Sequence, residues 1–335
     1  MKPKDIELKK QINGLLRTVD QDAKPEHCLL CGKKGEPVCN SHIVPQFILK
    51  GISDNGMICY GQSLFDTIDN LIETKKGINN SFTFRLICRD CDQKKFATYE
   101  DPNTIINFEE LDNGKKNAAL IEMALKTHLA HINTKAHVYA LNQRVYPVES
   151  QTIKNNGEIT AYEIDIDEHL RYIKDLTRAR KSTSFTFDVL YNTLLDYEVG
   201  IAAQTIIAYQ YDLKGNKLFE PKDFITTNLT RYFYLVIFPY NGKTRIMFYI
   251  ERKYKYLVKP IIDDFLSLSD EEKLHFLFIS LIIYDEQFYI NPTLQQRIKN
   301  DKKLVKLYTI TDAYFVNDDT RKEIKNFRKY NNYLL

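Results

Sequence analysis

Two Cys-x-x-Cys pairs, Cys28 with Cys31 and Cys88 with Cys91, constrain the fold more than any other feature of this sequence. In a reducing compartment the thiols stay free, so a disulfide framework is not expected. Paired spacing of this kind is typical of a tetrahedral zinc ion (Zn²⁺) held by four thiolates. Such an ion has no open coordination position. We therefore expect it to stabilise a small fold and to take no part in chemistry.

The composition is that of an ordinary globular protein. Of the 335 residues, 44% are hydrophobic and 27% are charged, which excludes a chain that is disordered throughout. The formal net charge of +3 gives no argument for nucleic acid, so only a local basic cluster would provide one. No apolar run approaches the roughly 18 residues of a membrane span, and the N-terminal residues lack the apolar segment of a signal peptide. We expect a cytoplasmic protein with no membrane contact.

The pattern of apolar and turn-forming residues predicts an α+β protein. The expected helices cover residues 5–20, 91–100 and about 113–133, and the expected strands cover 82–87, 158–167, 200–213 and 231–239. Asn241-Gly242 predicts a hairpin turn after the last strand. Residues 53–81, rich in Asn, Gly, Asp and Ser, favour a long loop. Ser269 and Glu272 predict a capping box, and Asn291-Pro292 predicts another helix start.

These elements suggest four segments. The predicted segments are an N-terminal helix (1–24), a zinc-binding unit (25–105), a helical connector (106–150) and an α+β domain of unassigned function (151–335). The polar, glycine-bearing stretch ESQTIKNNGE at 149–158 favours a boundary near 140–155.

The cysteine-bearing segment contains CLLCG at 28–32, SHIVPQFILK at 41–50 and LICRDCDQKKFATYED at 86–101. Together these motifs resemble the zinc-stapled HNH, or ββα-metal, nucleases over about residues 25–105. The resemblance implies a zinc-bound ββα unit and cleavage of phosphodiester bonds. By position it makes His42 the general base and Asp92 a ligand of a catalytic Mg²⁺ or Mn²⁺ ion.

The resemblance implies that neutral His42 takes a proton from water while the ion stabilises charge on the phosphate. Glu100 lies eight residues after Asp92, which places both on one face of the expected helix. It would complete the metal shell or orient a ligand, the alternative being a solvated helix charge. For His42 the alternative is a hydrogen bond within the cysteine-bearing zinc-binding turn, and for Asp92 it is the N-cap of the helix.

Ser41 stands where many members of the family have a metal-binding Asp, and no middle Asn of the motif is identified. These departures favour an alternative in which the unit is a catalytically degenerate zinc-binding interaction or sensor module. A further alternative is a nuclease directed to RNA, because groups that contact phosphate do not discriminate the two nucleic acids.

Stand-alone proteins resembling this chain suggest a role in bacterial phage defence or a mobile element. The expected partners are therefore DNA rather than RNA, together with a second copy of the chain or a partner defence protein.

Several other residues could suggest functional sites but are better explained as structural or surface residues. His128 and His131, three apart on the long helix, favour a solvent-facing side over a metal site. Cys39 and Cys59 favour inert thiols over extra ligands. Two basic stretches, 171–181 and 297–329, are either phosphate contacts or solvated helix surfaces.

Overall fold

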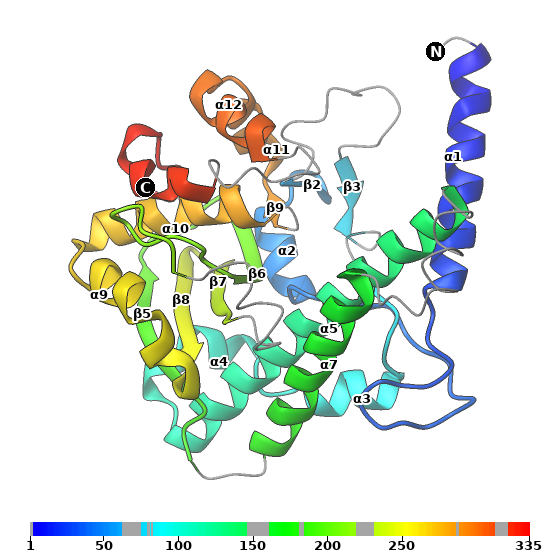
Figure 1. The fold of residues 1–335 in the computed structure, drawn as a ribbon, viewed down its shortest axis with the longest axis horizontal. Helices are drawn as coiled ribbons and strands as arrows, with labels where there is room; N and C mark the ends of the chain where they lie inside the picture. The colour runs from blue at the N-terminus through cyan, green and yellow to red at the C-terminus, as the bar shows by residue number, and fades with distance from the viewer. Residues whose placement is uncertain are drawn as a thin grey trace.

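The computed structural model describes residues 3–61, 75–78, 81, 83–145, 161–180, 184–218, 231–285, 288–311 and 321–335. It has the mixed α+β architecture that the sequence predicts. The helices pack around one large sheet (Figure 1). Within the described ranges, no helix combines the length and the apolar character needed to cross a membrane.

The central sheet has seven strands in the order β3-β2-β9-β6-β7-β8-β5, and every neighbouring pair is antiparallel. The strands are β2 (Met57–Tyr60), β3 (Lys75–Gly77), β5 (Phe187–Leu195), β6 (Ile201–Ile207), β7 (Phe233–Tyr240), β8 (Lys243–Glu251) and β9 (Tyr289–Ile290). The sheet therefore combines two strands of the cysteine-bearing segment with five from the second half of the chain. The predicted division into four segments stays a prediction.

The α-helices are α1 (Pro3–Asp22), α2 (Gln46–Ile52), α3 (Arg89–Lys95), α4 (Pro102–Ile106), α5 (Asn113–Val145), α7 (Ala161–Ala179), α9 (Lys259–Leu266), α10 (Asp270–Tyr284), α11 (Pro292–Lys299) and α12 (Lys302–Thr311). The described residues also form the 3-10 helices η3 (Phe108–Glu110), η4 (Arg252–Val258) and η5 (Lys322–Lys329).

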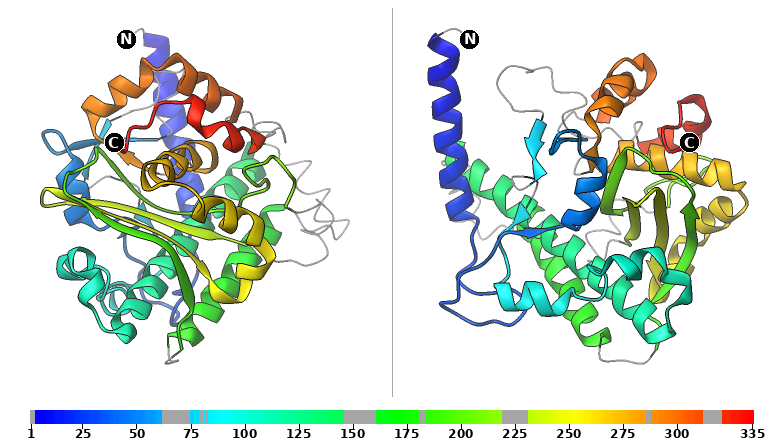
Figure 2. Two further views of the ribbon diagram at one scale, coloured as in Figure 1. Left: turned by 90° about the vertical axis from the view of Figure 1, so that its left-hand side faces the viewer. Right: turned by 180° about the vertical axis from the view of Figure 1, so that it is seen from behind.

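The sheet separates two hydrophobic cores, because successive residues of a strand point to opposite faces. In β7, Phe233 and Leu235 belong to one core, whereas Tyr234 and Val236 belong to the other. Helices α9 and α10 pack in the first core, and α5 and α7 pack in the second. The ribbon views show the two pairs of helices on opposite sides of the sheet (Figures 1 and 2).

A small ββα arrangement stands beside the second core. Strand β1 (Ser41–His42) pairs antiparallel with β4 (Thr83–Phe84), and the chain then enters α3. The Phe84 side chain is fully buried in the core that α5 shares. This arrangement brings the two cysteine pairs and the SHIVP segment together.

Several local predictions are confirmed. The N-terminal helix is α1, and the long helix is α5, which continues to Val145. The β7–β8 hairpin turns at Asn241 and Gly242, both with positive φ, as its sequence requires. Ser269 and Glu272 form the capping box of α10, and Asn291 caps α11.

Three local predictions are wrong. Residues 53–81 do not form one loop, because they contain β2 and β3. The strand expected over 158–167 is replaced from residue 161 by helix α7, and 158–160 lie outside the described residues. The alternation around 162–167 suggests a strand, but Ile166, Leu170 and Ile173 continue at helical spacing toward the second core. The helix expected over 91–100 is α3, which ends at Lys95.

Candidate metal centre and the adjoining polar site

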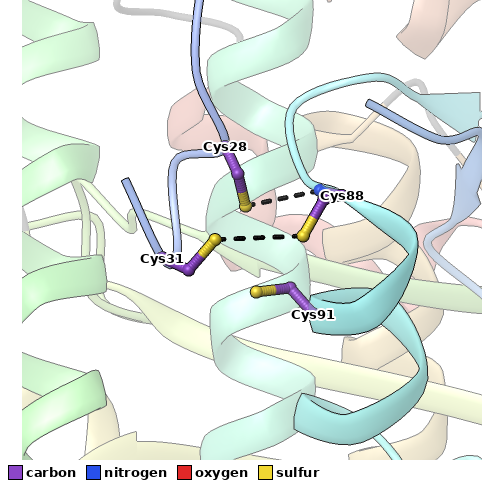
Figure 3. A group of neighbouring side chains, drawn as sticks. All are labelled: Cys28, Cys31, Cys88 and Cys91. Carbon is purple, nitrogen blue, oxygen red and sulfur yellow. Dashed lines mark hydrogen bonds between the residues drawn. The ribbon is translucent and has the colours of Figure 1, made fainter. Parts of the chain in front are cut away.

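The four predicted zinc ligands converge on one point. The Sγ atoms of Cys28, Cys31, Cys88 and Cys91 all lie within 4.8 Å of one another, and their side chains point toward a common centre (Figure 3). The Cys31 and Cys88 sulfurs are 3.9 Å apart. Tetrahedral zinc with bonds of about 2.3 Å places sulfurs about 3.8 Å apart. The cluster therefore fits a structural zinc ion.

Local backbone geometry forms this cluster. Gly32, with φ of +70°, lets the chain turn sharply after Cys31, and its N–H donates to the Cys28 carbonyl at 2.8 Å. The second pair lies at the start of α3, where the Cys88 N–H donates to the Cys28 sulfur at 3.3 Å. Burial opposes ionisation of Cys28. The N–H of Cys88 and neighbouring backbone donors outweigh that effect and lower the pKa of the Cys28 thiol to about 7.

The two remaining cysteines do not belong to the cluster. Cys59 is fully buried in the core between the sheet and α10. Cys39 is half-buried, and burial raises the pKa of its thiol to about 11. Both therefore fit the inert thiols that the sequence favours.

Ser41 and Asp92 connect β1 to α3 next to the zinc cluster. The Ser41 hydroxyl donates a hydrogen bond to Asp92 Oδ1. The alternative that Asp92 is the helix N-cap is wrong, because Cys88 holds that position and Asp92 lies one turn into the helix. Asp92 is thus available to side chains from other elements.

Lys126 of α5 supplies the cation at this place. Its Nζ lies 3.3 Å from Asp92 Oδ1 and forms an ion pair with Glu100 Oε1. The same ammonium lies over the rings of Phe96 and Tyr99, at 4.8 and 5.6 Å from their centroids. Only 2% of the Lys126 side chain is exposed. Lys126 is not among the residues that the motifs single out, although a lysine within an apolar helical run is a signal for a buried ion pair.

Glu100 reaches the site by a different route from the one expected. It is not on the helical face of Asp92, because α3 ends at Lys95 and a turn follows. Glu122 of α5 causes the change: its carboxylate accepts the backbone N–H groups of Thr98 and Tyr99 at 2.8 and 3.1 Å. Helix α5 therefore holds the chain after Lys95 in a turn, and α3 does not continue. Burial raises the pKa of Glu100, although the Lys126 ammonium opposes that rise.

His42 is close to these groups but faces another neighbour. Burial lowers the pKa of its imidazole, and the Ile78 backbone, which favours the protonated ring, partly opposes that shift. Its Nε2 is enclosed and has no hydrogen-bond partner among the described residues. Adjacent residues of a strand point to opposite faces, and Ser41 is the one that faces Asp92.

The predicted catalytic residues therefore do not form a common ligand set. Among the described residues, the four-cysteine cluster is the only group of three or more His, Cys, Asp or Glu side chains whose ligand atoms are placed to hold a metal ion. His42, Asp92 and Glu100 lie around Lys126 without meeting that geometry. As arranged, they do not fit a Mg²⁺ or Mn²⁺ ion, which prefers about six oxygen ligands.

The long-helix histidines are not solvent-facing, contrary to the sequence interpretation. His128 is fully buried, and its two ring nitrogens bond His169 Nδ1 at 2.9 Å and Tyr234 Oη at 2.8 Å. His131 packs against His169. This network joins α5, α7 and β7, and burial lowers the pKa values of all three imidazoles. It fits a polar core in which the rings are neutral.

A cavity of about 660 Å³ opens beside Asp92. It is lined by Lys24, Pro37, Val38, Cys39, Asn40, Arg85, Arg89, Asp92 and Gln93. Arg85 is held by Asp20 at 2.8 Å and by Asn40. Lys24 and Arg89 are exposed, so the cavity presents more positive than negative side chains.

No protein-family model matches the chain, and neither the curated proteins nor the solved structures give a significant match. The resemblance to HNH nucleases therefore depends on the three motifs alone.

Proposed function

We propose that the unit over residues 25–105 is HNH-like and acts on the phosphodiester backbone of DNA as an endonuclease. The observation that carries the proposal is the β1–β4 pair leading into α3, with both cysteine pairs converging and Ser41 bonded to Asp92. The fold expected from the motifs and the observed topology agree at these positions. A role in bacterial phage defence or a mobile element belongs to the same proposal.

His42 supplies the base in this proposal. Its lowered pKa keeps the imidazole neutral at pH 7, and a neutral ring nitrogen can take a proton from water. The enclosed Nε2, which has no hydrogen-bond partner among the described residues, is the acceptor in this proposal. Because Nε2 is enclosed, substrate binding has to admit a water molecule to it. In this proposal Lys126, and not Mg²⁺ or Mn²⁺, provides the positive charge beside Asp92.

The cavity beside Asp92 supports a nucleic-acid partner. Lys24, Arg85 and Arg89 line it against the single acid Asp92, and cationic side chains of this kind contact phosphates. The same side chains would contact the phosphates of RNA. The choice of DNA therefore depends on the resemblance to HNH nucleases, and both nucleic acids have to be tested.

A second candidate function is a zinc-stapled binding or sensor module without hydrolysis. The orientation of His42 favours it, because the ring faces Ile78 while Ser41 faces Asp92. In this case the basic cavity binds a nucleic-acid backbone and nothing is cleaved.

A cleavage assay separates the two functions. Zinc-loaded full-length protein is incubated with supercoiled plasmid or labelled RNA in Mg²⁺, Mn²⁺ or EDTA. If the protein is a nuclease, His42→Ala lowers the rate by about 10²–10⁴-fold, the usual contribution of a general base. His275→Ala on α10 is the matched control, because that imidazole is also half-buried and lies outside the site. Cleavage that survives His42→Ala refutes the proposed mechanism.

A binding assay tests the module. Affinity for a labelled duplex and a labelled RNA is measured by fluorescence anisotropy as a function of salt. Arg89→Ala is expected to weaken binding and reduce the slope of log K against log salt by about 1, which is the effect of one lost phosphate contact. Lys243→Ala, at the hairpin tip, removes the same charge elsewhere. Equal losses of affinity in both variants would contradict a specific contact at the cavity beside Asp92.

A further inference from the structure

Lys126 stands where the resemblance places a divalent ion. Its Nζ contacts Asp92 Oδ1 at 3.3 Å and pairs with Glu100. The Ser41 hydroxyl bonds the same Asp92 oxygen, so this oxygen already has two partners. The position between the two carboxylates is therefore taken by a group of this chain.

Charge balance argues for the same assignment. Two carboxylates and one ammonium leave a single negative charge, which the Ser41 hydroxyl and solvent at the half-exposed Glu100 can accommodate. A divalent ion added beside the ammonium meets strong repulsion at this short range. Such an ion could enter only if the ammonium left.

The packing around Lys126 holds the ammonium in place. The side chain is 2% exposed, and the rings of Phe96 and Tyr99 lie within cation–π distance of Nζ. Its backbone belongs to a stretch of α5 in which residues 119–130 are all buried. Moving the ammonium to water would require the surrounding core to open.

We propose that Lys126 is the resident cation of this site and that it excludes Mg²⁺ and Mn²⁺ from the Asp92–Glu100 pair. The choice of Mg²⁺ and Mn²⁺ as the excluded ions rests on the proposed nuclease function. Its test measures ion binding and not cleavage, so either proposal can fail without the other.

The test is Mn²⁺ titration of the zinc-loaded full-length protein, followed by electron paramagnetic resonance of free Mn²⁺. Lys126→Met is expected to gain a site that binds Mn²⁺ at least about tenfold more tightly than wild type, which corresponds to about 1.4 kcal/mol. Adding Asp92→Asn to Lys126→Met is expected to remove the gain. Lys126→Arg keeps the charge and is expected to behave as wild type.

Lys135→Met is the matched control, because Lys135 pairs with Asp165 at 2.8 Å elsewhere on α5. Zinc content and circular dichroism establish that each variant is folded. The wild-type chain gives a second measurement that needs no folded Lys126→Met: Asp92→Asn alone should leave Mn²⁺ binding unchanged. Wild-type Mn²⁺ binding that depends on Asp92, or a folded Lys126→Met variant with no gain in affinity, overturns the inference.

Discussion

Glu122 provides the sharpest stability prediction, because it is a fully buried acid that holds the chain after α3 against α5. Its carboxylate accepts the Thr98 N–H and hydroxyl at 2.8 and 2.9 Å and the Tyr99 N–H at 3.1 Å. The Arg180 guanidinium donates to it at 2.7 Å. The side chain has no exposed surface. We expect Glu122→Ala to be severely destabilising and Glu122→Gln to be milder.

The magnitude follows from the partners that each variant leaves without an acceptor. Removing one member of a buried ion pair costs about 3–5 kcal/mol. The Arg180 side chain is 27% exposed and can turn partly toward water, so we expect the lower end, about 3 kcal/mol, for Glu122→Ala. Gln keeps one carbonyl oxygen and loses the charge, which is expected to cost about 1–2 kcal/mol.

The assay is urea unfolding of the zinc-loaded protein, with the free energy of unfolding extrapolated to water. Glu110→Ala is the matched control, because Glu110 is an exposed glutamate of η3; its effect should stay within about 0.5 kcal/mol. If Glu122→Ala falls within 1 kcal/mol of wild type, the description of Glu122 as the anchor of residues 98–100 is wrong.

Three further predictions test other parts of the fold. Metal analysis should find about one zinc per chain, and Cys88→Ser should lose both the zinc and the fold of residues 25–105, seen by proteolysis; a protease-resistant, metal-free protein would contradict this. Acid should destabilise the protein: burial lowers the pKa of His131 to about 4, so its contribution is complete above about pH 6.5 and decreases as the pH falls toward 4. Between pH 7 and 5 the loss from His131 alone is about 2 kcal/mol, and urea midpoints that do not shift would refute a neutral imidazole network. Gly242→Ala should cost about 1 kcal/mol because φ there is +78°; no atom crowds the added Cβ, so the cost comes from the backbone conformation alone. Gly14→Ala within α1 is the control and should be neutral or stabilising. Equal melting temperatures of the two variants would show that the turn conformation is not the cause.

The sequence predicts the elements whose signals are local. The Asn241-Gly242 turn, the Ser269–Glu272 capping box and the two cysteine pairs each lie within a few residues, and each is found where it is expected. Strand β2 illustrates the opposite case. Its partners are β3 and the two-residue β9, about 230 residues away, so Met57–Tyr60 carries little signal of its own.

The candidate site is only partly predictable for the same reason. Ser41, Asp92 and the cysteines follow from the motifs, whereas the environment of Glu100 depends on α5. Helix α3 ends early because Glu122 takes N–H groups that a longer helix would use, a competition that no window around residue 100 contains. Lys126 is missed because periodicity describes where a helix buries its side chains and not which buried charge finds a partner.

Helix α5 therefore determines the properties of the cysteine-bearing unit as much as the zinc cluster does. The four-cysteine cluster brings Cys88 and Cys91 to the first cysteine pair, but Glu122 sets where the following turn runs and Lys126 sets the charge between Asp92 and Glu100. Both residues lie on one helix, four positions apart, on the side that faces α3. A change in how α5 packs against the sheet would move the anchor and the cation together. The charge at the proposed site and the course of the chain after α3 therefore both depend on a helix that lies outside residues 25–105.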